Sequence, residues 1–185
     1  KPTMLALRNR FVPQLARSFS TSPARLVKAG DKIPSVSLFE GSPGNEVNLA
    51  EEAASGKAVI VGVPGAFSPA CLASHIPGFL QHLSEFKNKG YDSIYVTGVN
   101  DAFVFKAWGE AVNKQGADNV RFLADPKGEF AKTWDVLFDA SKFFGNERSE
   151  RYAVLVEDGK VTQAFVEPEK TAIDVSAADA VLKQI

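Results

Sequence analysis

The sequence contains a single cysteine, Cys71, among its 185 residues. One cysteine cannot pair with another in the same chain, so disulfides do not stabilise this fold. The sequence also lacks an apolar run of about twenty residues, and no membrane-spanning helix is therefore indicated. With 45% apolar residues, the chain can still bury a substantial core. At this length it most simply forms one domain.

Histidine is almost as scarce, since only His75 and His82 occur. Their spacing, and that of the carboxylates, does not resemble a metal-ligand set. The glycines before Cys71, Gly62 and Gly65, fit neither of the common glycine-rich phosphate-binding patterns. The sequence therefore predicts no metal site and no cofactor.

Acidic residues are absent from residues 1–30, which carry six basic side chains. The other 155 residues hold 15 basic and 22 acidic side chains, a net charge of −7. A mildly acidic body without a basic patch argues against a nucleic-acid partner.

Residues 4–27 are rich in Arg, Ser and Ala and contain no acid, a composition typical of a mitochondrial transit peptide. Residues 1–3 precede Met4 and look like a cloning remnant. We therefore expect residues 1–28 to be a disordered targeting segment for the mitochondrial matrix, and residues 29–185 to form the domain. A basic arm that binds an anionic partner is the alternative for the N-terminal segment.

The domain is organised around residues 58–71, which are predicted to form an uninterrupted apolar strand followed by a tight loop that ends at Cys71. A strand of this kind is typical of the middle of a sheet that is covered on both faces. Pro64 and Gly65 end the strand, and Pro69 favours the first turn of a helix. Cys71 is thus predicted near a helix N-terminus.

Strands and helices are predicted to alternate along the rest of the chain. Strands are expected at 35–39, 59–63, 91–99 and 121–124, and helices at 70–89 with a kink at Pro77-Gly78, 102–115 with Asp101 as its cap, and 128–136. Residues 151–156 and 161–166 predict a hairpin around Asp158-Gly159. Ser176 to Asp179 resembles a capping box that opens a last helix reaching Ile185. This order predicts an α/β, thioredoxin-like fold, a central mixed sheet flanked by helices in a single domain.

A lone cysteine is most often an inert buried side chain, and this is the alternative against which Cys71 must be weighed. A helix N-terminus, however, favours an anion such as a thiolate. Ser68 lies three residues earlier, so a turn can bring its hydroxyl to the sulfur or to a bound oxygen. Ser68 can equally cap the helix, and the two roles are compatible.

Residues 64–71, PGAFSPAC, resemble the peroxiredoxin motif P-x-x-x-[T/S]-x-x-C, and the longer stretch PGAFSPACLASHIPGF is similar to the type II, or peroxiredoxin-five-like, branch. Four further segments resemble that branch in the same order: VNDAFVFKAW at 99–108, LADP at 123–126, FGN at 144–146 and RYAVLVEDG at 151–159. The resemblance extends from about residue 29 to the end of the chain. Several ordered motifs are far more specific than one short pattern.

The resemblance implies a thiol peroxidase that reduces hydrogen peroxide and alkyl hydroperoxides in antioxidant defence and redox homeostasis. Cys71 would be the nucleophile and would become a sulfenic acid. The Ser68 hydroxyl, the Cys71 backbone N–H and the Arg151 guanidinium would stabilise the developing charge, and Pro64 would shield the sulfur from water. Arg148 competes with Arg151 for this role.

The resemblance also implies a substrate pocket formed by Gly65, Phe67, Ala70 and Phe144, and a possible homodimer. Trp108 and the Phe143-Phe144 pair are expected to be core or pocket wall. His75, one turn after Cys71, is expected to be an exposed helix residue, although a protonated imidazole there would add positive charge near the sulfur.

The sequence departs from many such relatives by lacking a second, resolving cysteine. Val96 and about Val175 occupy the places where relatives carry one. We therefore expect an external thiol, supplied by glutathione with glutaredoxin or by thioredoxin, to reduce Cys71. The alternative function is a peroxide sensor or a holdase chaperone with the same fold.

Overall fold

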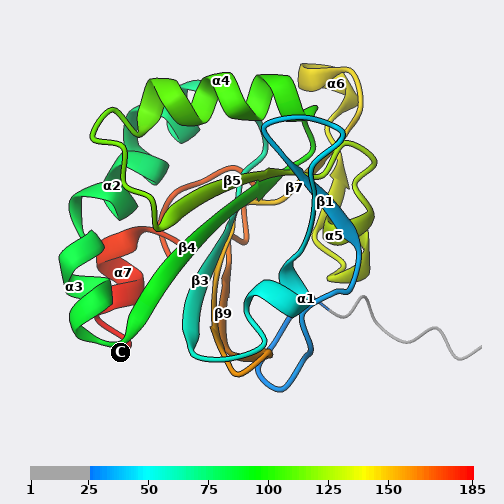
Figure 1. Cartoon of the computed structure of the whole chain (residues 1–185). Helices are drawn as coiled ribbons and strands as arrows, with labels where there is room; N and C mark the ends of the chain where they lie inside the picture. The colour runs from blue at the N-terminus through cyan, green and yellow to red at the C-terminus, as the bar shows by residue number, and fades with distance from the viewer. Residues whose placement is uncertain (1–25) are drawn as a thin grey trace, which may run out of the picture.

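A computed structural model describes residues 26–185 and has a seven-stranded mixed sheet at its centre (Figure 1). The strand order is β2-β1-β5-β4-β3-β8-β9. These strands are β1 (Ser37–Glu40), β2 (Glu46–Asn48), β3 (Lys57–Gly62), β4 (Tyr91–Gly98), β5 (Val120–Ala124), β8 (Tyr152–Glu157) and β9 (Lys160–Val166). A separate two-stranded sheet pairs β6 (Leu137–Asp139) with β7 (Glu147–Ser149). The predicted thioredoxin-like fold, a mixed sheet flanked by helices, is confirmed.

Helices cover both faces of the sheet (Figure 1). They are α1 (Leu49–Glu52), the π-helix η1 (Cys71–His75), α2 (Ile76–Gln81), α3 (Leu83–Asn88), α4 (Ala102–Val112), α5 (Glu129–Thr133), α6 (Ser141–Phe144) and α7 (Ala178–Leu182). Within residues 26–185, every helix is too short or too polar to cross a bilayer.

β3 lies inside the sheet, and this position explains why its sequence from Ala58 onward is uniformly apolar. Val59 and Val61 pack with side chains of α2, α3, α4 and α7 on one face. Ala58 and Ile60 pack on the other face with side chains of α1 and α5. Both faces of β3 are thus removed from water, as predicted for a strand without polar alternation.

Two local predictions are confirmed in detail. The β8–β9 hairpin turns at Asp158 and Gly159, which have φ angles of 49° and 76°, as a tight two-residue turn requires. Asp101 caps α4, because its carboxylate accepts hydrogen bonds from the backbone N–H groups of Phe103 and Val104 at 2.9 Å each.

Two predictions about helices are wrong. The expected helix over 70–89 begins with a π-helical segment and breaks at His82 rather than at Pro77-Gly78, because the proline occupies the second position of α2, where its missing N–H is tolerated. The capping box at Ser176 does not form. Ala177 is the N-cap of α7, and the Ser176 hydroxyl is engaged elsewhere.

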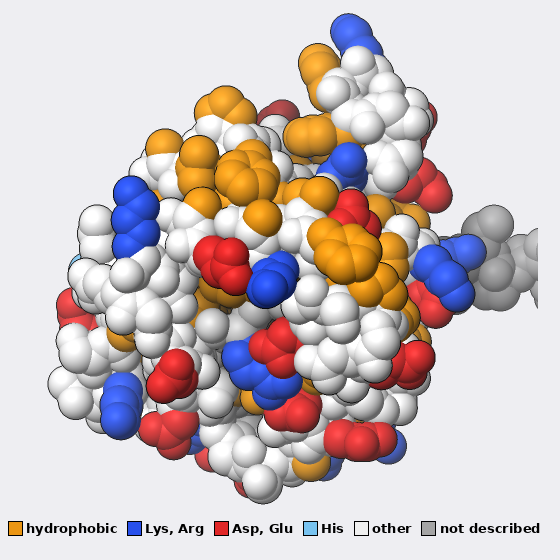
Figure 2. Space-filling model, turned by 45° about the horizontal axis from the view of Figure 1, so that its top comes forward, with side chains coloured by type: hydrophobic (Ala, Val, Ile, Leu, Met, Phe, Trp, Pro, Cys, Tyr) orange, Lys and Arg blue, Asp and Glu red, His pale blue; other side chains and the backbone are white. Residues whose placement is uncertain are grey.

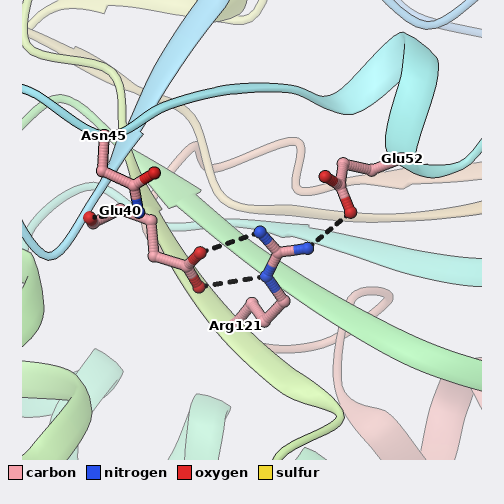
Figure 3. A network of polar contacts seen from close by, with 4 residues as sticks. All are labelled: Glu40, Asn45, Glu52 and Arg121. Carbon is pink, nitrogen blue, oxygen red and sulfur yellow. Dashed lines mark hydrogen bonds and ion pairs between the residues drawn. The ribbon is translucent and has the colours of Figure 1, made fainter.

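The edge of the sheet that is farthest from β8 is held by a polar network around Arg121 of β5 (Figure 3). The Arg121 guanidinium donates to both carboxylate oxygens of Glu40 in β1, at 3.0 and 2.8 Å, and to Glu52 of α1 at 2.6 Å. The two carboxylates raise the pKa of Arg121, with the hydrogen bond to Glu40 as the largest cause. Bidentate pairs of this geometry are stronger than single ion pairs, and the pair with Glu40 fastens β1 to β5. The hydrogen bond to Glu52 holds α1 to the same strand.

Residues 1–25, which contain most of the predicted transit peptide, lie outside the described residues. Val27 is buried, and its N–H donates to the Trp134 carbonyl at 3.0 Å. The packing of the domain therefore already includes residues just before position 29.

Candidate active site

Antiparallel pairing of β3 with β8 brings together the two segments that carry Cys71 and Arg151. Gly62, the last residue of β3, is paired with Tyr152, the first residue of β8. The segment that follows β3 leads to Cys71, and Arg151 directly precedes β8. The two segments therefore meet at the same end of these paired strands. A Cβ on Gly62 would lie 2.1 Å from the Tyr152 ring, so only glycine fits at this crossing.

The loop from β3 to the helix turns sharply to present Cys71. The Ala66 N–H donates to the Asn100 side chain at 3.0 Å, which ties the loop to the segment after β4. Phe67 has a φ angle of 59°, an uncommon conformation for a side chain of this size. Helical structure then begins at Pro69, one residue after Ser68.

Cys71 begins the π-helical segment and is completely buried. Its carbonyl accepts a hydrogen bond from the Ile76 N–H, five residues later, instead of from residue 75. Short π-helical segments inside α-helices are rare and occur often at functional sites. The segment here contains both Cys71 and His75.

Arg151 reaches the sulfur although it lies 80 positions along the chain. Its Nη1 lies 3.3 Å from Cys71 Sγ and 3.1 Å from His75 Nδ1, and its Nε donates to the Thr171 carbonyl at 3.1 Å. Arg151 is 1% exposed, so this positive charge is shielded from water. Coulombic attraction to a thiolate is stronger in such a setting than at the surface.

Arg148, the competing guanidinium, takes a different place. It donates from Nη1 to the Val99 carbonyl at 2.9 Å and from Nε to the Asn146 side chain at 2.8 Å. Its guanidinium also lies over the Phe144 ring, 4.9 Å from the centroid. The structure therefore brings Arg151, and not Arg148, to the cysteine.

The expectation for His75 is wrong, since this histidine is buried and belongs to the site. Its Nδ1 faces Arg151, and its Nε2 lies 3.1 Å from the Ser176 carbonyl and 3.2 Å from the Ser176 hydroxyl. Burial, aided by the Arg151 charge, lowers the pKa of His75 to about 3. His75 is therefore neutral at physiological pH and adds no positive charge near the sulfur.

The predicted pocket residues differ in how far they are exposed to solvent. Pro64 and Gly65 are buried, Ala70 and Ser68 are partly buried, and Phe67 is exposed. Phe144 packs on Gly65, where an added Cβ would lie 3.0 Å from its ring. Phe143, expected in the core or pocket wall, is 79% exposed, whereas Trp108 is a core residue.

Ser68 lies one turn before Cys71, and its carbonyl accepts from the Leu72 N–H at 2.9 Å. Its hydroxyl makes no hydrogen bond to any residue within 26–185, and the same holds for Nη2 of Arg151. These two donors remain available to a molecule that approaches the sulfur.

Three residues around the site, Thr171, Ser176 and Glu167, were not predicted from the sequence. The Thr171 carbonyl accepts a hydrogen bond from Arg151 Nε. The Ser176 hydroxyl contacts His75 Nε2 and lies 2.7 Å from Glu167 Oε1. The one signal at Ser176 was its match to a capping box, which pointed to a different role. The only sequence signal for Glu167 is its place directly after an apolar strand, which is a weak indication of a buried carboxylate.

A buried thiol that faces a buried guanidinium, at the start of a helix on a thioredoxin-like sheet, defines a thiol-dependent oxidoreductase site. Comparison with known proteins narrows this class. Residues 28–182 match the Redoxin family model.

The chain is 45% identical over 160 residues to the peroxisomal membrane associated protein 20 of Schizosaccharomyces pombe, with 86% of this chain and 100% of that protein aligned. It is 38% identical over 162 residues to peroxiredoxin-2B of Arabidopsis thaliana, with 86% and 98% aligned. Among solved structures, reduced Prx3 of Vibrio vulnificus in complex with hydrogen peroxide has a TM-score of 0.79 and 36% identity, over 86% of this chain and 100% of that one.

The chain therefore belongs to the Redoxin family, and within it to the peroxiredoxins. It is a thiol-dependent peroxidase with an antioxidant function. The predicted family, fold and enzyme class are thus confirmed.

The two histidines should titrate very differently, because their surroundings shift their pKa values in opposite directions. A hydrogen bond to Glu85, with a further contribution from Asp179, raises the pKa of His82, whereas burial lowers that of His75 to about 3. In an NMR titration from about pH 5 to pH 8, near the ordinary histidine pKa, one imidazole signal should titrate and the other should stay neutral. A His82→Gln variant assigns the signals, and two titrating histidines would contradict the site geometry.

Proposed function

We propose that Cys71 is the peroxidatic nucleophile and that an external thiol reduces its sulfenic acid, with hydrogen peroxide and alkyl hydroperoxides as substrates. The observation that carries this proposal is the 3.3 Å contact between Arg151 Nη1 and Cys71 Sγ in a chain with no second cysteine. The hydrogen peroxide complex of the related Vibrio vulnificus protein supports the choice of substrate.

In the first step the Cys71 thiolate attacks one peroxide oxygen. A sulfur–oxygen bond forms, the O–O bond breaks, and the leaving oxygen takes up a proton to become water or an alcohol. Cys71 is oxidised to a sulfenic acid while the peroxide is reduced. Charge moves from sulfur to the leaving oxygen during this step, so donors aimed at the oxygens accelerate it.

Arg151 and Ser68 are the side chains proposed to supply those donors, together with the Cys71 N–H. The five N–H bonds of a guanidinium point in fixed directions. Arg151 uses Nε for Thr171 and Nη1 for Cys71 and His75, which leaves Nη2 for the peroxide. The buried Pro64 is proposed to limit the access of water, and Gly65, Phe67, Ala70 and Phe144 to line the approach.

In the second step a thiol of glutathione, glutaredoxin or thioredoxin attacks the Cys71 sulfur, releasing water and forming a mixed disulfide. A second external thiol then attacks this disulfide and returns Cys71 to its reduced state. Val96 and Val175, where many relatives carry a resolving cysteine, cannot replace it. Because Cys71 is fully buried, the start of its helix must open before an external thiol can reach the sulfur.

Arg151→Ala should slow the reaction of Cys71 with peroxide by about 10² to 10³, the usual cost of removing one such donor. Stopped-flow measurement of the second-order rate constant with hydrogen peroxide checks this. Arg148→Ala is the matched control, because it removes a nearby guanidinium that does not contact the sulfur, and its rate should fall much less. Equal losses in both variants would remove Arg151 from its proposed role.

The external-thiol step predicts a mixed disulfide. After one equivalent of peroxide and then glutathione, intact-mass spectrometry should show one glutathione adduct, and Cys71→Ser should show none. Steady-state peroxide consumption with glutathione and glutaredoxin is then compared with consumption on thioredoxin and its reductase. If no adduct forms while thioredoxin supports turnover, glutathione is not the reductant.

We also propose that the enzyme forms a homodimer through the face around the site. Four large apolar side chains are exposed there: Phe67, Leu72, Phe103 and Phe143. Figure 2 shows hydrophobic side chains gathered over this side of the molecule, where α4 and α6 lie. Apolar groups that gather on one surface commonly mark a protein interface.

Phe103→Glu should therefore shift the protein from dimer to monomer in sedimentation velocity, because a charge would be placed in an apolar contact. Leu26→Glu is the control, since Leu26 is also exposed but precedes Val27, which packs on the opposite face of the sheet. A wild-type protein that sediments as a monomer at all concentrations would overturn the proposal.

The mitochondrial matrix remains the proposed location, supported by the composition of residues 4–27 alone. Fusion of residues 1–28 to a fluorescent reporter tests it directly. A reporter that stays in the cytosol would contradict the assignment.

A further inference from the structure

Glu167, the residue directly after β9, is a buried carboxyl group that the proposed chemistry does not use. It is 1% exposed. Three donors converge on its Oε1: the Ser176 hydroxyl at 2.7 Å, the Ser176 N–H at 2.8 Å and the Asp174 N–H at 2.7 Å. Its Oε2 is buried and has no hydrogen-bond partner among the described residues. A buried polar oxygen without a partner is costly to keep, so the position of Glu167 calls for an explanation.

The contacts that join Glu167 to Arg151 permit only one direction of hydrogen bonding. A guanidinium can only donate, so His75 Nδ1 accepts from Arg151 Nη1 at 3.1 Å. The proton of the neutral ring then lies on Nε2, which donates to the carbonyl or hydroxyl oxygen of Ser176 at 3.1 and 3.2 Å. The Ser176 hydroxyl in turn donates to Glu167 Oε1. Glu167 is therefore the acceptor at which this series ends.

Glu167 also organises the loop that holds the other side of the guanidinium. The Glu167 N–H donates to the Arg151 carbonyl at 2.9 Å, and the Arg151 N–H donates to the Lys170 carbonyl at 2.7 Å. The next carbonyl, that of Thr171, accepts from Arg151 Nε at 3.1 Å. Because Oε1 closes the same loop at residues 174 and 176, the position of the Thr171 carbonyl depends on Glu167 as well.

We propose that Glu167 is a positioning residue for Arg151, acting through Ser176 and His75 on Nη1 and through the 167–176 loop on Nε. This inference rests on the proposed role of Arg151 in the reaction with peroxide. With both nitrogens fixed, Nη1 stays at the Cys71 sulfur and Nη2 points to the place of the peroxide. A displacement of reacting groups by about 1 Å can slow a reaction about 10²-fold.

Glu167→Gln should therefore slow the oxidation of Cys71 by hydrogen peroxide by about 10- to 100-fold, as loss of a supporting residue commonly does. The rate at which iodoacetamide alkylates Cys71 at the same pH should change much less, because alkylation requires no oriented peroxide. Glu169→Gln is the matched control, because it removes an exposed carboxylate from the same loop, and both of its rates should stay near those of the wild type.

A double-mutant cycle with Arg151→Ala separates positioning from general loss of structure. If Glu167 acts through Arg151, then Glu167→Gln should leave the already slow peroxide rate of Arg151→Ala unchanged. A Glu167→Gln rate within twofold of the wild type, or an equal loss in both backgrounds, would overturn the inference. If Arg151→Ala itself reacts at the normal rate, the proposed function of Arg151 fails instead.

Ser176→Ala provides a second variant in case Glu167→Gln does not fold, as circular dichroism would reveal. It removes only the hydroxyl that links His75 to Glu167. The peroxide rate should fall in the same direction, and again only when Arg151 is present. An unchanged rate in folded Ser176→Ala would overturn the part of the inference that runs through His75, and Ser176→Thr, which keeps the hydroxyl, should recover any loss.

Discussion

The contact between the Arg151 guanidinium and the Cys71 sulfur is the constraint on which the rest of the site depends. A cation removed from water is stabilised by hydrogen-bond partners for its N–H groups and by anionic or polar groups that lie close by. Arg151 finds these partners in the sulfur, in His75 and in the Thr171 carbonyl. The segment between β9 and α7 supplies the Thr171 carbonyl, and Ser176 of the same segment contacts the far side of His75.

The sheet makes that contact possible. β3 and β8 are adjacent antiparallel strands inside the sheet, so the chain leaving β3 and the chain entering β8 meet at the same end of the two strands. Gly62 permits the close approach of Tyr152 at this crossing. The Arg121 network stabilises the other side of the same sheet. It holds β1 and α1 to β5, which pairs through β4 with β3.

A neutral histidine suits this arrangement better than a charged one. A protonated His75 would place a second positive charge against Arg151 Nη1 and would remove the acceptor that holds it. Burial prevents this by lowering the pKa of His75 to about 3. The candidate site thus has one fixed cation, held by a neutral ring, instead of two cations that repel each other.

The sequence by itself determined the elements whose causes are local. The apolar run of β3, the Asp158-Gly159 turn and the Asp101 cap depend on neighbouring residues. Motif resemblance identified the family and predicted the pairing of Cys71 with Arg151, which lie in contact in the structure. Tertiary structure alone decided the burial of His75, the break at His82 and the engagement of Ser176 by Glu167. His75 meets Arg151 and Ser176, which lie 76 and 101 positions away, and His82 pairs with Asp179 of α7. Ser176 meets Glu167 across the loop between β9 and α7, and hydrogen bonds of these kinds leave no periodic pattern in the sequence.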